Sequence, residues 1–314
     1  MGEKTKIKGF SLVELLITIV IMMILLAGGV YIYTKFLKET STEGETTEKQ
    51  IERLVALDIM RLDIEHIGYG VGKNPDVNND YRVYDIDNTN HTFVIHSTLN
   101  NSDNTTIGWR LCDSGSVAVE QMEAPNNNFV YVGSNGYVAE VRTDGNCPST
   151  GSYIGYPFED EAIACDFNGT TFCTEIVYYL SNTNLPKKCN PNTYNLLRKV
   201  NNSIGGDPLL SCVADIRYTT DLDTNADGKI DIKNNTNNTD ILTPTDLRVQ
   251  TKRISVYILY QEAFAPDSKS TPDGTDGNGA YLERDGIKLY LPDGYENYRW
   301  KILKLSVKPM SIIK

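Results

Sequence analysis

The sequence predicts an α+β fold, in which one long hydrophobic N-terminal α-helix precedes a large antiparallel, β-rich head with long loops. Two observations lead to this prediction. The first is an apolar run that continues into a helical repeat, with no proline between Lys35 and Ile67. The second is the region after Gly70, where short runs rich in Val, Ile, Tyr, Phe and Thr alternate with clusters of Asn, Asp, Gly and Ser. This alternation is typical of antiparallel strands joined by turns.

The apolar run from Phe10 to Tyr33 contains 24 residues and one formal charge, Glu14. As a helix it would be about 36 Å long, enough to cross a bilayer core of roughly 30 Å. Three lysines lie among the nine residues before it. Because lysines beside a span favour the cytoplasmic side, we expect a single membrane pass, with the N-terminus in the cytoplasm and the head exported.

Glu14 is the unusual residue of this span, because an ionisable group inside hydrocarbon costs a few kcal/mol and is a functional candidate by default. One alternative is a plain membrane anchor that tolerates Glu14 near the interface. Another is a secretory signal peptide, for which Ala27-Gly28-Gly29 could serve as the cleavage site. A signal peptide, however, has a shorter apolar core.

The order of a basic leader, Gly9 and then Phe10-Ser-Leu-Val-Glu14-Leu-Leu resembles the signal of type IV prepilins. The resemblance implies that prepilin peptidase cuts between Gly9 and Phe10 and methylates the new Phe10 amine. Glu14 would then meet the N-terminal amine of a neighbouring subunit, and the two charges would neutralise each other. The implied segments are a cleaved leader (1–9), a transmembrane and assembly helix (10–68) and an exported head (69–314).

Composition limits the function classes. At 314 residues and 40% hydrophobic, the chain is long enough to bury one or two sizeable cores. Its net charge is −11, and removal of residues 1–9 would leave about −13, since they carry three lysines and one glutamate. An acidic surface argues against broad electrostatic binding to nucleic acid.

All six cysteines lie in the part of the chain that we expect to be exported. They are Cys112, Cys147, Cys165, Cys173, Cys189 and Cys212. An even number in an oxidising compartment predicts disulfides, although many connectivities are open and buried free thiols are the alternative. Turn residues between close neighbours favour the pairs Cys165–Cys173 and Cys189–Cys212.

Helical character continues beyond the apolar run. Apolar residues recur at three- and four-residue steps, with charged residues between them. These are Ile51, Leu54, Val55, Ile59 and Leu62. Gly68-Tyr69-Gly70 supplies a stop, which predicts one helix from Phe10 to about Ile67. Its weak points are Gly28-Gly29 and the Thr40–Thr47 stretch around Gly44, because Gly is about 1 kcal/mol less favourable than Ala in a helix.

Beyond Gly70 the alternation predicts ten strands and five loops. The strands are Tyr81–Ile86, Thr92–Ser97, Gly108–Cys112, Phe129–Val132, Val138–Thr143, Thr174–Leu180, Leu196–Lys199, Val213–Thr219, Arg248–Tyr260 and Tyr298–Val307. The predicted surface loops are Asn74–Asp80, Asn88–Asn90, Asn100–Asn104 and Lys233–Asp240. Pro266–Gly279 is predicted to be a mobile loop between the last two strand regions.

One loop has the pattern of a calcium site. Oxygen-bearing side chains stand at positions 1, 3, 5 and 9, a glycine takes the sharp-turn position and a backbone carbonyl is available at position 7. An Asn replaces the bidentate Glu of EF-hands at position 12, so we expect a weak affinity of about 10⁻⁴ to 10⁻³ M. The alternative is a metal-free turn. The predicted Ca²⁺ ligands are Asp223, Asn225, Asp227, Lys229, Asp231 and Asn234.

The sequence contains no motif that predicts catalysis. His91 and His96 are separated by an odd number of residues on a predicted strand, which places them on opposite faces, and His66 lies near the end of the long helix. No Gly-x-Ser-x-Gly or P-loop motif is present. We therefore expect a non-catalytic protein.

Several stretches of the head resemble PilW-type minor pilins. They are the Asp-rich helix exit Leu57–Gly70, the paired-tyrosine strand Ile176–Leu180, the strands Leu196–Arg198 and Val213–Tyr218, and the last two strands, Arg248–Tyr260 and Arg299–Val307. The resemblance implies a minor pilin that takes part in type IV pilus assembly, as initiator or as a tip or shaft subunit. Its implied partners are prepilin peptidase, other pilins through the helix, and the assembly machinery. The alternatives are a pseudopilin of type II secretion and a membrane-tethered adhesive or binding protein.

Overall fold

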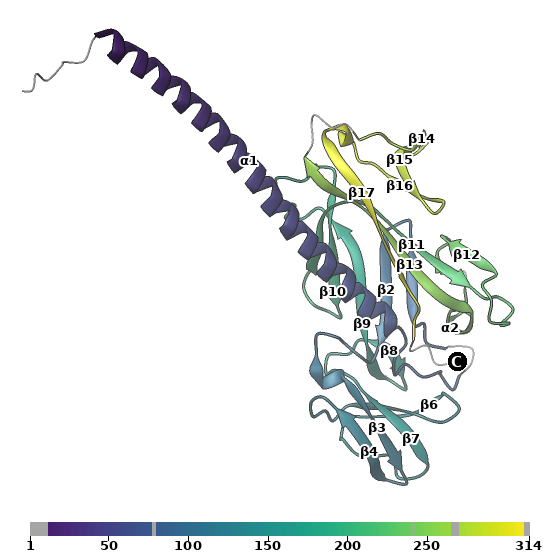
Figure 1. Cartoon of the computed structure of the whole chain (residues 1–314). Coiled ribbons are helices and arrows are strands. Elements are labelled where there is room, and N and C mark those ends of the chain that lie inside the picture. The colour runs from purple at the N-terminus through teal and green to yellow at the C-terminus, as the bar shows by residue number, and fades with distance from the viewer. Residues whose placement is uncertain (1–11, 77–79, 240–241, 265–269, 311–314) are drawn as a thin grey trace, which may run out of the picture. The chain divides into compact units, whose positions relative to one another are not determined.

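The computed structural model describes residues 12–76, 80–239, 242–264 and 270–310, without the side chains of residues 13–15, 24, 27 and 34–50. The chain divides into two compact units, Met1–Ile51 and Glu52–Lys314. All of the described strands lie in the second unit, which we call the head. An N-terminal apolar helix followed by a large antiparallel β domain confirms the predicted α+β class (Figure 1).

The long helix α1 (Leu12–Glu65) extends for 54 residues and confirms the helix that the apolar run and its repeat predict. It passes without a break through Gly28-Gly29 and through residues 40–47, the two stretches that the sequence marks as weak. Both stretches therefore remain helical.

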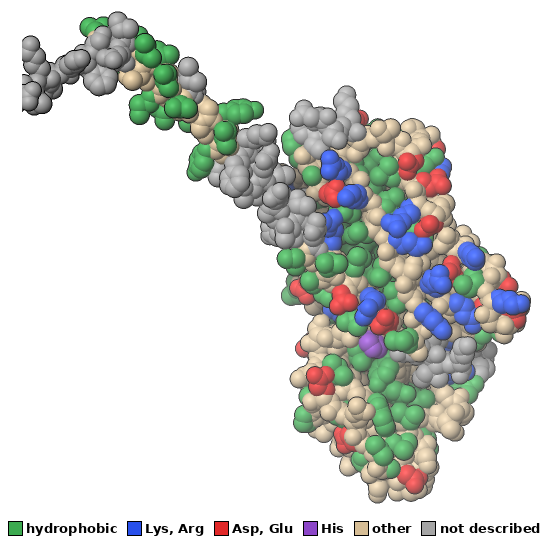
Figure 2. Space-filling view, in the orientation of Figure 1, with side chains coloured by type: hydrophobic (Ala, Val, Ile, Leu, Met, Phe, Trp, Pro, Cys, Tyr) green, Lys and Arg blue, Asp and Glu red, His purple; other side chains and the backbone are tan. Residues whose placement is uncertain are grey.

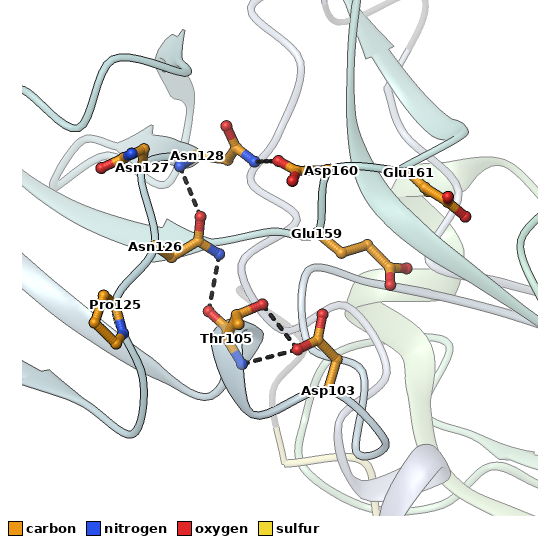
Figure 3. A pocket seen from close by; sticks show the side chains of 9 residues that line it. All are labelled: Asp103, Thr105, Pro125, Asn126, Asn127, Asn128, Glu159, Asp160 and Glu161. Carbon is orange, nitrogen blue, oxygen red and sulfur yellow. Dashed lines mark hydrogen bonds between the residues drawn. The ribbon is translucent and has the colours of Figure 1, made fainter.

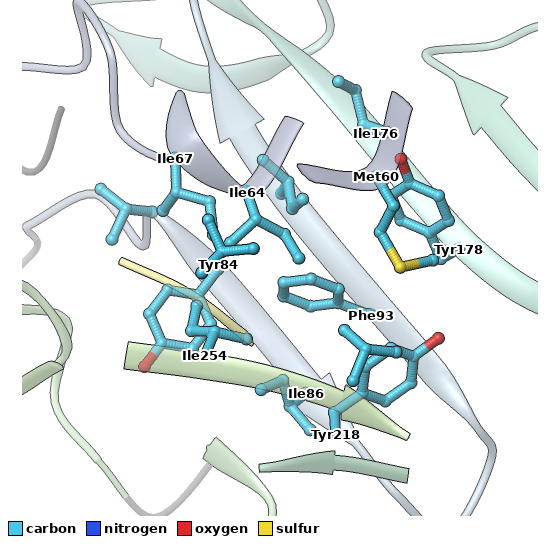
Figure 4. Close-up of a cluster of buried hydrophobic side chains, with 14 of the residues drawn as sticks. Met60, Ile64, Ile67, Tyr84, Ile86, Phe93, Ile176, Tyr178, Tyr218 and Ile254 are labelled. Carbon is cyan, nitrogen blue, oxygen red and sulfur yellow. The ribbon is translucent and has the colours of Figure 1, made fainter. Parts of the chain in front are cut away.

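The last turns of α1 belong to the head. Met60 and Ile64 are 1% and 0% exposed, and they share one core with Phe93 and Tyr178 (Figure 4). The compact unit that contains the strands begins at Glu52, so the last turns of α1 pack with the head that the sequence predicts for residues 69–314.

The main sheet is antiparallel, and its core surrounds the end of α1. Along the sheet the strands follow the order β1 (Tyr84–Asp87), β2 (Thr92–Ser97), β9 (Thr170–Ser181), β10 (Tyr194–Val200), β11 (Asp207–Leu222), β13 (Thr251–Phe264) and β17 (Tyr298–Val307). Two short strands extend it, β8 (Ala164–Phe167) beside β9 and β12 (Ile232–Asn235) beside β11.

A separate five-stranded antiparallel sheet lies at the bottom of the view in Figure 1, below the main sheet. Its order is β4 (Ser116–Met122), β3 (Gly108–Asp113), β7 (Ser152–Pro157), β5 (Phe129–Val132) and β6 (Val138–Arg142). The connection from the main sheet includes the 3-10 turn η2 (Asn104–Thr106).

A small third sheet covers part of the main one. It consists of β14 (Gly274–Asp276), β15 (Gly279–Arg284) and β16 (Ile287–Tyr290). Tyr257 and Leu259 of β13 pack against Leu289 of β16, while Val256 and Ile258 face the core that holds α1. Because both faces of β13 are covered, its sequence is nearly continuously apolar.

Each of the ten predicted strands overlaps an observed strand, and three have the predicted bounds: β2, β5 and β17. The prediction that a strand begins at Arg248 is wrong. Thr243 caps a short helix, α2 (Pro244–Gln250), by a reciprocal capping box with Asp246, and β13 begins only at Thr251. Capping of this kind stabilises a helix start. The sequence analysis also missed seven strands: β4, β7, β8, β12, β14, β15 and β16.

Two of the predicted surface loops are anchored in the core. Asn88 and Asn100 are 7% and 5% exposed. The Asn88 amide donates to the carbonyls of Tyr218 and Thr236, and Asn100 Nδ2 donates to Glu159. Buried amides satisfied in this way hold loops in place, so the surface assignment is wrong for Asn88 and Asn100, while Asn90 and Asn104 are exposed as predicted.

The other loop predictions hold only in part. Lys233–Asp240 contains most of β12, and Pro266–Gly279 contains β14. In the Asn74–Asp80 stretch, Asp80 pairs with the buried Arg248, with 3.3 Å between Oδ2 and Nε. Residues 77–79, 240–241 and 265–269 lie outside the described residues.

The end of α1 is fixed by a buried ion pair. The Asp63 carboxylate, 1% exposed, accepts from Arg198 Nε at 2.6 Å and from Arg198 Nη2 at 3.2 Å. It also accepts from the Tyr178 hydroxyl and from Asn101 Nδ2. Four donors on three separate segments therefore surround one carboxylate of the helix.

The charges of this cluster change the acidity of its members. Burial acts to lower the pKa of Arg198, but the Asp63 carboxylate more than offsets this, and the pKa is raised. Burial, followed by the nearby Asp63 charge, raises the pKa of Tyr178 well above its ordinary value. Arg198 therefore stays charged and Tyr178 stays neutral, which is the combination that satisfies a buried carboxylate.

The chain leaves the helix through Gly68 and Gly70, which both have positive φ, 74° and 69°. A Cβ on Gly70 would lie 2.1 Å from Thr98 Oγ1, so only glycine fits here. The Gly68 amide donates to the His96 carbonyl, and the Thr98 amide donates to the Tyr69 carbonyl. This exit thereby pairs with the end of β2.

All six cysteines are paired, as Cys112–Cys147, Cys165–Cys173 and Cys189–Cys212. The two near-sequence pairs are those that the sequence favours. The third joins β3 to the segment between β6 and β7, across 35 residues. Closing loops of 8 to 35 residues is worth roughly 2.5 to 4 kcal/mol each in the chain-entropy model.

The ion pair at the helix end makes a testable prediction. Arg198→Met keeps the packed stem but leaves Asp63 buried without a counter-charge, which should lower the free energy of unfolding by about 3 to 5 kcal/mol. The matched control is Arg61→Met, because Arg61 pairs with Asp58 and Glu65 at the surface of the same helix, where such pairs contribute less than about 1 kcal/mol. Urea denaturation followed by tryptophan fluorescence measures both, and equal losses would contradict the structural role of the pair.

Candidate functional site

The first candidate site is the N-terminal segment. Gly9 and Phe10, the predicted cleavage residues, lie outside the described residues, as does the side chain of Glu14. The Glu14 backbone is in the first turns of α1. The structure therefore places Glu14 on a helix and adds nothing on its partner.

The helix that follows has the surface of a membrane span. Leu16–Tyr33 forms an 18-residue window with a mean hydropathy of 2.4, and none of it is buried. It is long and apolar enough to cross a bilayer by length and composition. Large side chains such as Leu25 and Tyr31 are 70% and 69% exposed, and Figure 2 shows hydrophobic side chains along this part of α1. A helix that is apolar all round requires lipid or other helices around it.

The second candidate is the predicted calcium loop between β11 and β12. Asp223 is fully buried and accepts from the backbone amides of Asp227, at 3.2 Å, and Gly228, at 2.9 Å. Asn225 Oδ1 accepts from the Asp227 amide, and Asp227 Oδ1 accepts from the Lys229 amide. These bonds hold the loop in a tight turn in which Gly228 has a φ of 88°.

Two of the predicted ligands have partners outside the centre of that turn. Asp231 Oδ2 accepts from the amide and hydroxyl of Thr224. Asn234 Nδ2 donates to the Asp285 carbonyl. In the part of the chain that the structure describes, no cluster of three or more His, Cys, Asp or Glu residues has the arrangement of a metal site.

A cation of the chain itself lies beside the loop. Lys252 Nζ is 2.9 Å from Asp223 Oδ2. This ammonium lowers the pKa of Asp223, and the backbone donors add to the effect. The sequence analysis missed Lys252 because the residue reaches Asp223 only through the pairing of β11 with β13.

The three histidines have separate environments. His66 Nδ1 lies 2.7 Å from the Leu62 carbonyl oxygen. His91 Nδ1 is 3.4 Å from Asp215 Oδ1, and burial raises the pKa of that carboxyl. His96 Nε2 is 3.4 Å from Glu175 Oε2 and lowers the pKa of Glu175. The structure therefore brings none of the three histidines together.

The structure also shows a pocket that the sequence analysis did not predict. It has a volume of about 490 Å³ and is lined by Asn, Asp and Glu side chains (Figure 3). Three of its four carboxylates accept from neutral donors: Thr105 binds Asp103, Asn128 binds Asp160, and Thr174 binds Glu159. Asn201 also binds Glu159. Because Glu159 follows β7 while Thr174 and Asn201 belong to the β9–β10 region, these contacts join the two larger sheets.

Comparison with known proteins adds evidence for the N-terminal segment. Residues 4–30 match the model of the prokaryotic N-terminal methylation motif. The matched residues include Gly9, Phe10 and Glu14 and most of the exposed apolar window. A search of the curated proteins found no match.

Among solved structures, the chain is similar to a type IV-like pilin from Thermus thermophilus. The identity is 9%, the match covers 84% of this chain and 97% of that chain, and the TM-score is 0.37. A similarity this remote says nothing about what the head binds. What the comparisons show of this chain is therefore the N-terminal methylation motif, which overlaps the exposed apolar window of α1.

Proposed function

We propose that this protein is a non-catalytic minor pilin that is inserted in the inner membrane, processed by prepilin peptidase and incorporated into a type IV pilus. The observation that carries the proposal is the methylation motif at residues 4–30, which leads directly into a helix window with no buried residue. Neighbouring subunits would cover this apolar surface once the protein leaves the membrane. The resemblance of the head segments to PilW-type minor pilins supports the choice of class.

Three of those resembling segments meet at one point of the head. Asp63 comes from the helix exit, Tyr178 from the paired-tyrosine strand and Arg198 from the following strand, and together they form the buried cluster. The resemblance therefore concerns residues with a joint structural role, which favours a shared head architecture over a chance similarity of strands.

In this proposal Glu14 sets the register of assembly. A carboxylate in an apolar helix bundle is costly unless an opposite charge meets it. The methylated amine of Phe10 in a neighbouring subunit would supply that charge. Pairing would then be favourable only at one axial offset between helices.

Two alternatives make different demands on the same residues. A pseudopilin of type II secretion would use the same helix in another assembly, and purified pili would lack the protein. A tethered adhesive protein would need the helix only as an anchor, so Glu14 would be dispensable. Mass spectrometry of purified filaments, which gives presence and copy number, separates the pilus from the secretion assembly.

The first prediction from this proposal concerns processing. The mature chain should begin at Phe10 with a methylated amine, and Gly9→Val should leave residues 1–9 attached. Gly2→Val, a matched change within the leader, should be processed normally. Intact-mass analysis of membrane fractions measures all three proteins. Residues 1–9 retained on the assembled wild-type chain would contradict the proposal.

The second prediction concerns assembly. Glu14→Ala should leave membrane insertion and the folding of the head unchanged, because the residue is distant in sequence from the head, but should remove the protein from pili. Thr18→Ala, one helical turn further on, is the control and should assemble. Immunoblots of sheared pili and of membranes give the two measurements. Wild-type incorporation of Glu14→Ala would favour the tethered adhesive protein instead.

Calcium binding by the Asp223–Asn234 loop stays a prediction of its sequence. Its five acidic or amide side chains and one carbonyl suit a hard cation, and backbone amides already hold the turn closed. The Lys252 ammonium lies 2.9 Å from Asp223 Oδ2. A divalent ion bound by Asp223 would repel this ammonium. The loop would therefore fix the joint between β11 and β13 and would not act as a sensor.

A metal that binds only the folded state raises the free energy of unfolding by about 1.4 kcal/mol when its free concentration is ten times the dissociation constant. Millimolar calcium should therefore raise the melting temperature of the full-length chain by a few degrees, and a chelator should reverse the shift. Asp227→Ala should abolish it, Asp207→Ala on the exposed start of β11 should not, and Lys252→Met should strengthen it because the competing charge is gone. An unchanged melting temperature of the wild type in calcium would mean that the loop is a metal-free turn.

A further inference from the structure

At one end of the five-stranded sheet, the β3–β4 turn, the β5–β6 turn and the approach to β7 present a surface of unusual composition. Their sequences are Asp113-Ser-Gly-Ser116, Gly133-Ser-Asn-Gly-Tyr137 and Ser149-Thr-Gly-Ser-Tyr153. Nine of these fourteen residues are Ser or Gly, and most of the fourteen residues are exposed. Ser, Gly, Asn and Tyr together are the residues that recognition loops use, because they supply adaptable hydrogen bonds and rigid aromatic contacts.

A pocket of about 580 Å³ opens at this end of the sheet. Its lining includes Ser134, Asn135, Tyr137, Ser152 and Tyr153. The volume lies within the roughly 300–1,000 Å³ of small-ligand sites. None of the described residues that line it is Asp, Glu, Lys, Arg or His, although 23% of the chain is charged.

The polar groups of the pocket are available to a ligand. Asn135 Oδ1 accepts from the Tyr137 amide, which leaves the Asn135 amide nitrogen unused among the bonds of the described residues. The hydroxyls of Ser134, Tyr137 and Tyr153 likewise have no partner among the described residues. Two half-exposed phenol rings therefore stand beside several neutral donors and acceptors.

The frame around the pocket is rigid. The Ser114 amide donates to the Gly151 carbonyl, and Ser152 Oγ donates to Asp113 Oδ1, both at 2.9 Å. The Cys112–Cys147 disulfide lies directly behind, since Cys112 pairs with Tyr153 across β3 and β7. Loops that are held in this way lose little conformational entropy when a ligand binds.

We propose that this pocket binds a neutral oligosaccharide. A sugar ring has an apolar C–H face, which packs on an aromatic ring, and a rim of hydroxyls, which exchange hydrogen bonds with amides and hydroxyls. The lining of the pocket offers both. It offers no cation for a sialic acid or a sulfate and no carboxylate for a cationic ligand, and the net charge of −11 further repels acidic glycans. On the face shown in Figure 2, the lower part of the head carries few Lys or Arg side chains.

This proposal concerns the head and is independent of the assembly role of the helix. The test uses the purified full-length chain in detergent on an array of neutral and acidic oligosaccharides. Titration calorimetry then measures the affinity of the strongest neutral glycan. Ser134→Trp fills the pocket from an exposed position, and Tyr137→Ala removes one ring. Tyr194→Ala is the matched control, because Tyr194 is an exposed tyrosine, 38% accessible, on β10 of the main sheet.

Binding of neutral glycans that weakens at least tenfold in Ser134→Trp and in Tyr137→Ala, and stays within twofold in Tyr194→Ala, supports the proposal. Melting curves establish that each variant is folded, and Ser134→Trp decides the matter if Tyr137→Ala is unstable. Three results would overturn the proposal: no neutral glycan bound by the wild type, acidic glycans bound alone, or an unchanged affinity in the folded Ser134→Trp variant.

Discussion

A carboxylate that water does not reach determines how the head is built. Removing Asp63 and Arg198 from water costs several kcal/mol for each ion, and the structure offsets that cost only if all of their partners are in place. Tyr178, Asn101 and Arg198 reach Asp63 from β9, from the loop after β2 and from β10. The helix end, two strands and a loop therefore have one arrangement in which the charges are satisfied, and the apolar contacts of Met60 and Ile64 form in that same arrangement.

Disulfides and buried polar contacts stabilise different parts of the rest of the head. Cys112–Cys147 stabilises the five-stranded sheet from within, whereas Cys189–Cys212 ties the approach to β10 to β11 of the main sheet. Between these sheets, Glu159 receives donors from β9 and from the end of β10. Buried amides do the same for loops, since Asn88 satisfies two carbonyls that no strand reaches. Polar side chains thus join the sheets and loops to one another, whereas apolar side chains form the cores.

The parts of the fold that follow from local periodicity could be predicted from the sequence. The apolar residues between Ile51 and Leu62 recur at helical steps. In β2 and β17 the strand-forming residues stand out clearly enough to give the bounds of both strands. β4 was not predicted in this way, because its alternation is limited to Val117 and Val119, and every residue from Ser116 to Gln121 is exposed. Asn100 was assigned to the surface because an isolated Asn in a loop is usually solvated, and its partners Glu159 and Thr106 are known only from the fold.

The candidate sites also differ in whether they could be predicted from local sequence. Gly9, Phe10 and Glu14 form a contiguous motif, so sequence suffices to find them. The loop from Asp223 has a spacing that predicts its turn, but its ion pair with Lys252 depends on strand pairing between distant segments. The uncharged pocket beside Tyr137 and Tyr153 is assembled from the β5–β6 turn with the start of β6, the start of β7, and Pro75, and it has no signature along the chain.

The ribosome synthesises the helix long before the strands that it contacts. The helix face that holds Met60 and Asp63 is synthesised first, yet Tyr178 and Arg198 follow 115 and 135 residues later. The last strand, β17, pairs along β13, and Met310 donates to the Glu65 carbonyl. Contacts of such long separation make folding slow. A nascent chain that stops before β17 leaves the long apolar edge of β13 open, and open edges of this kind recruit other strands. Pairing of β17 covers this edge of β13, and β17 then forms the edge of the main sheet.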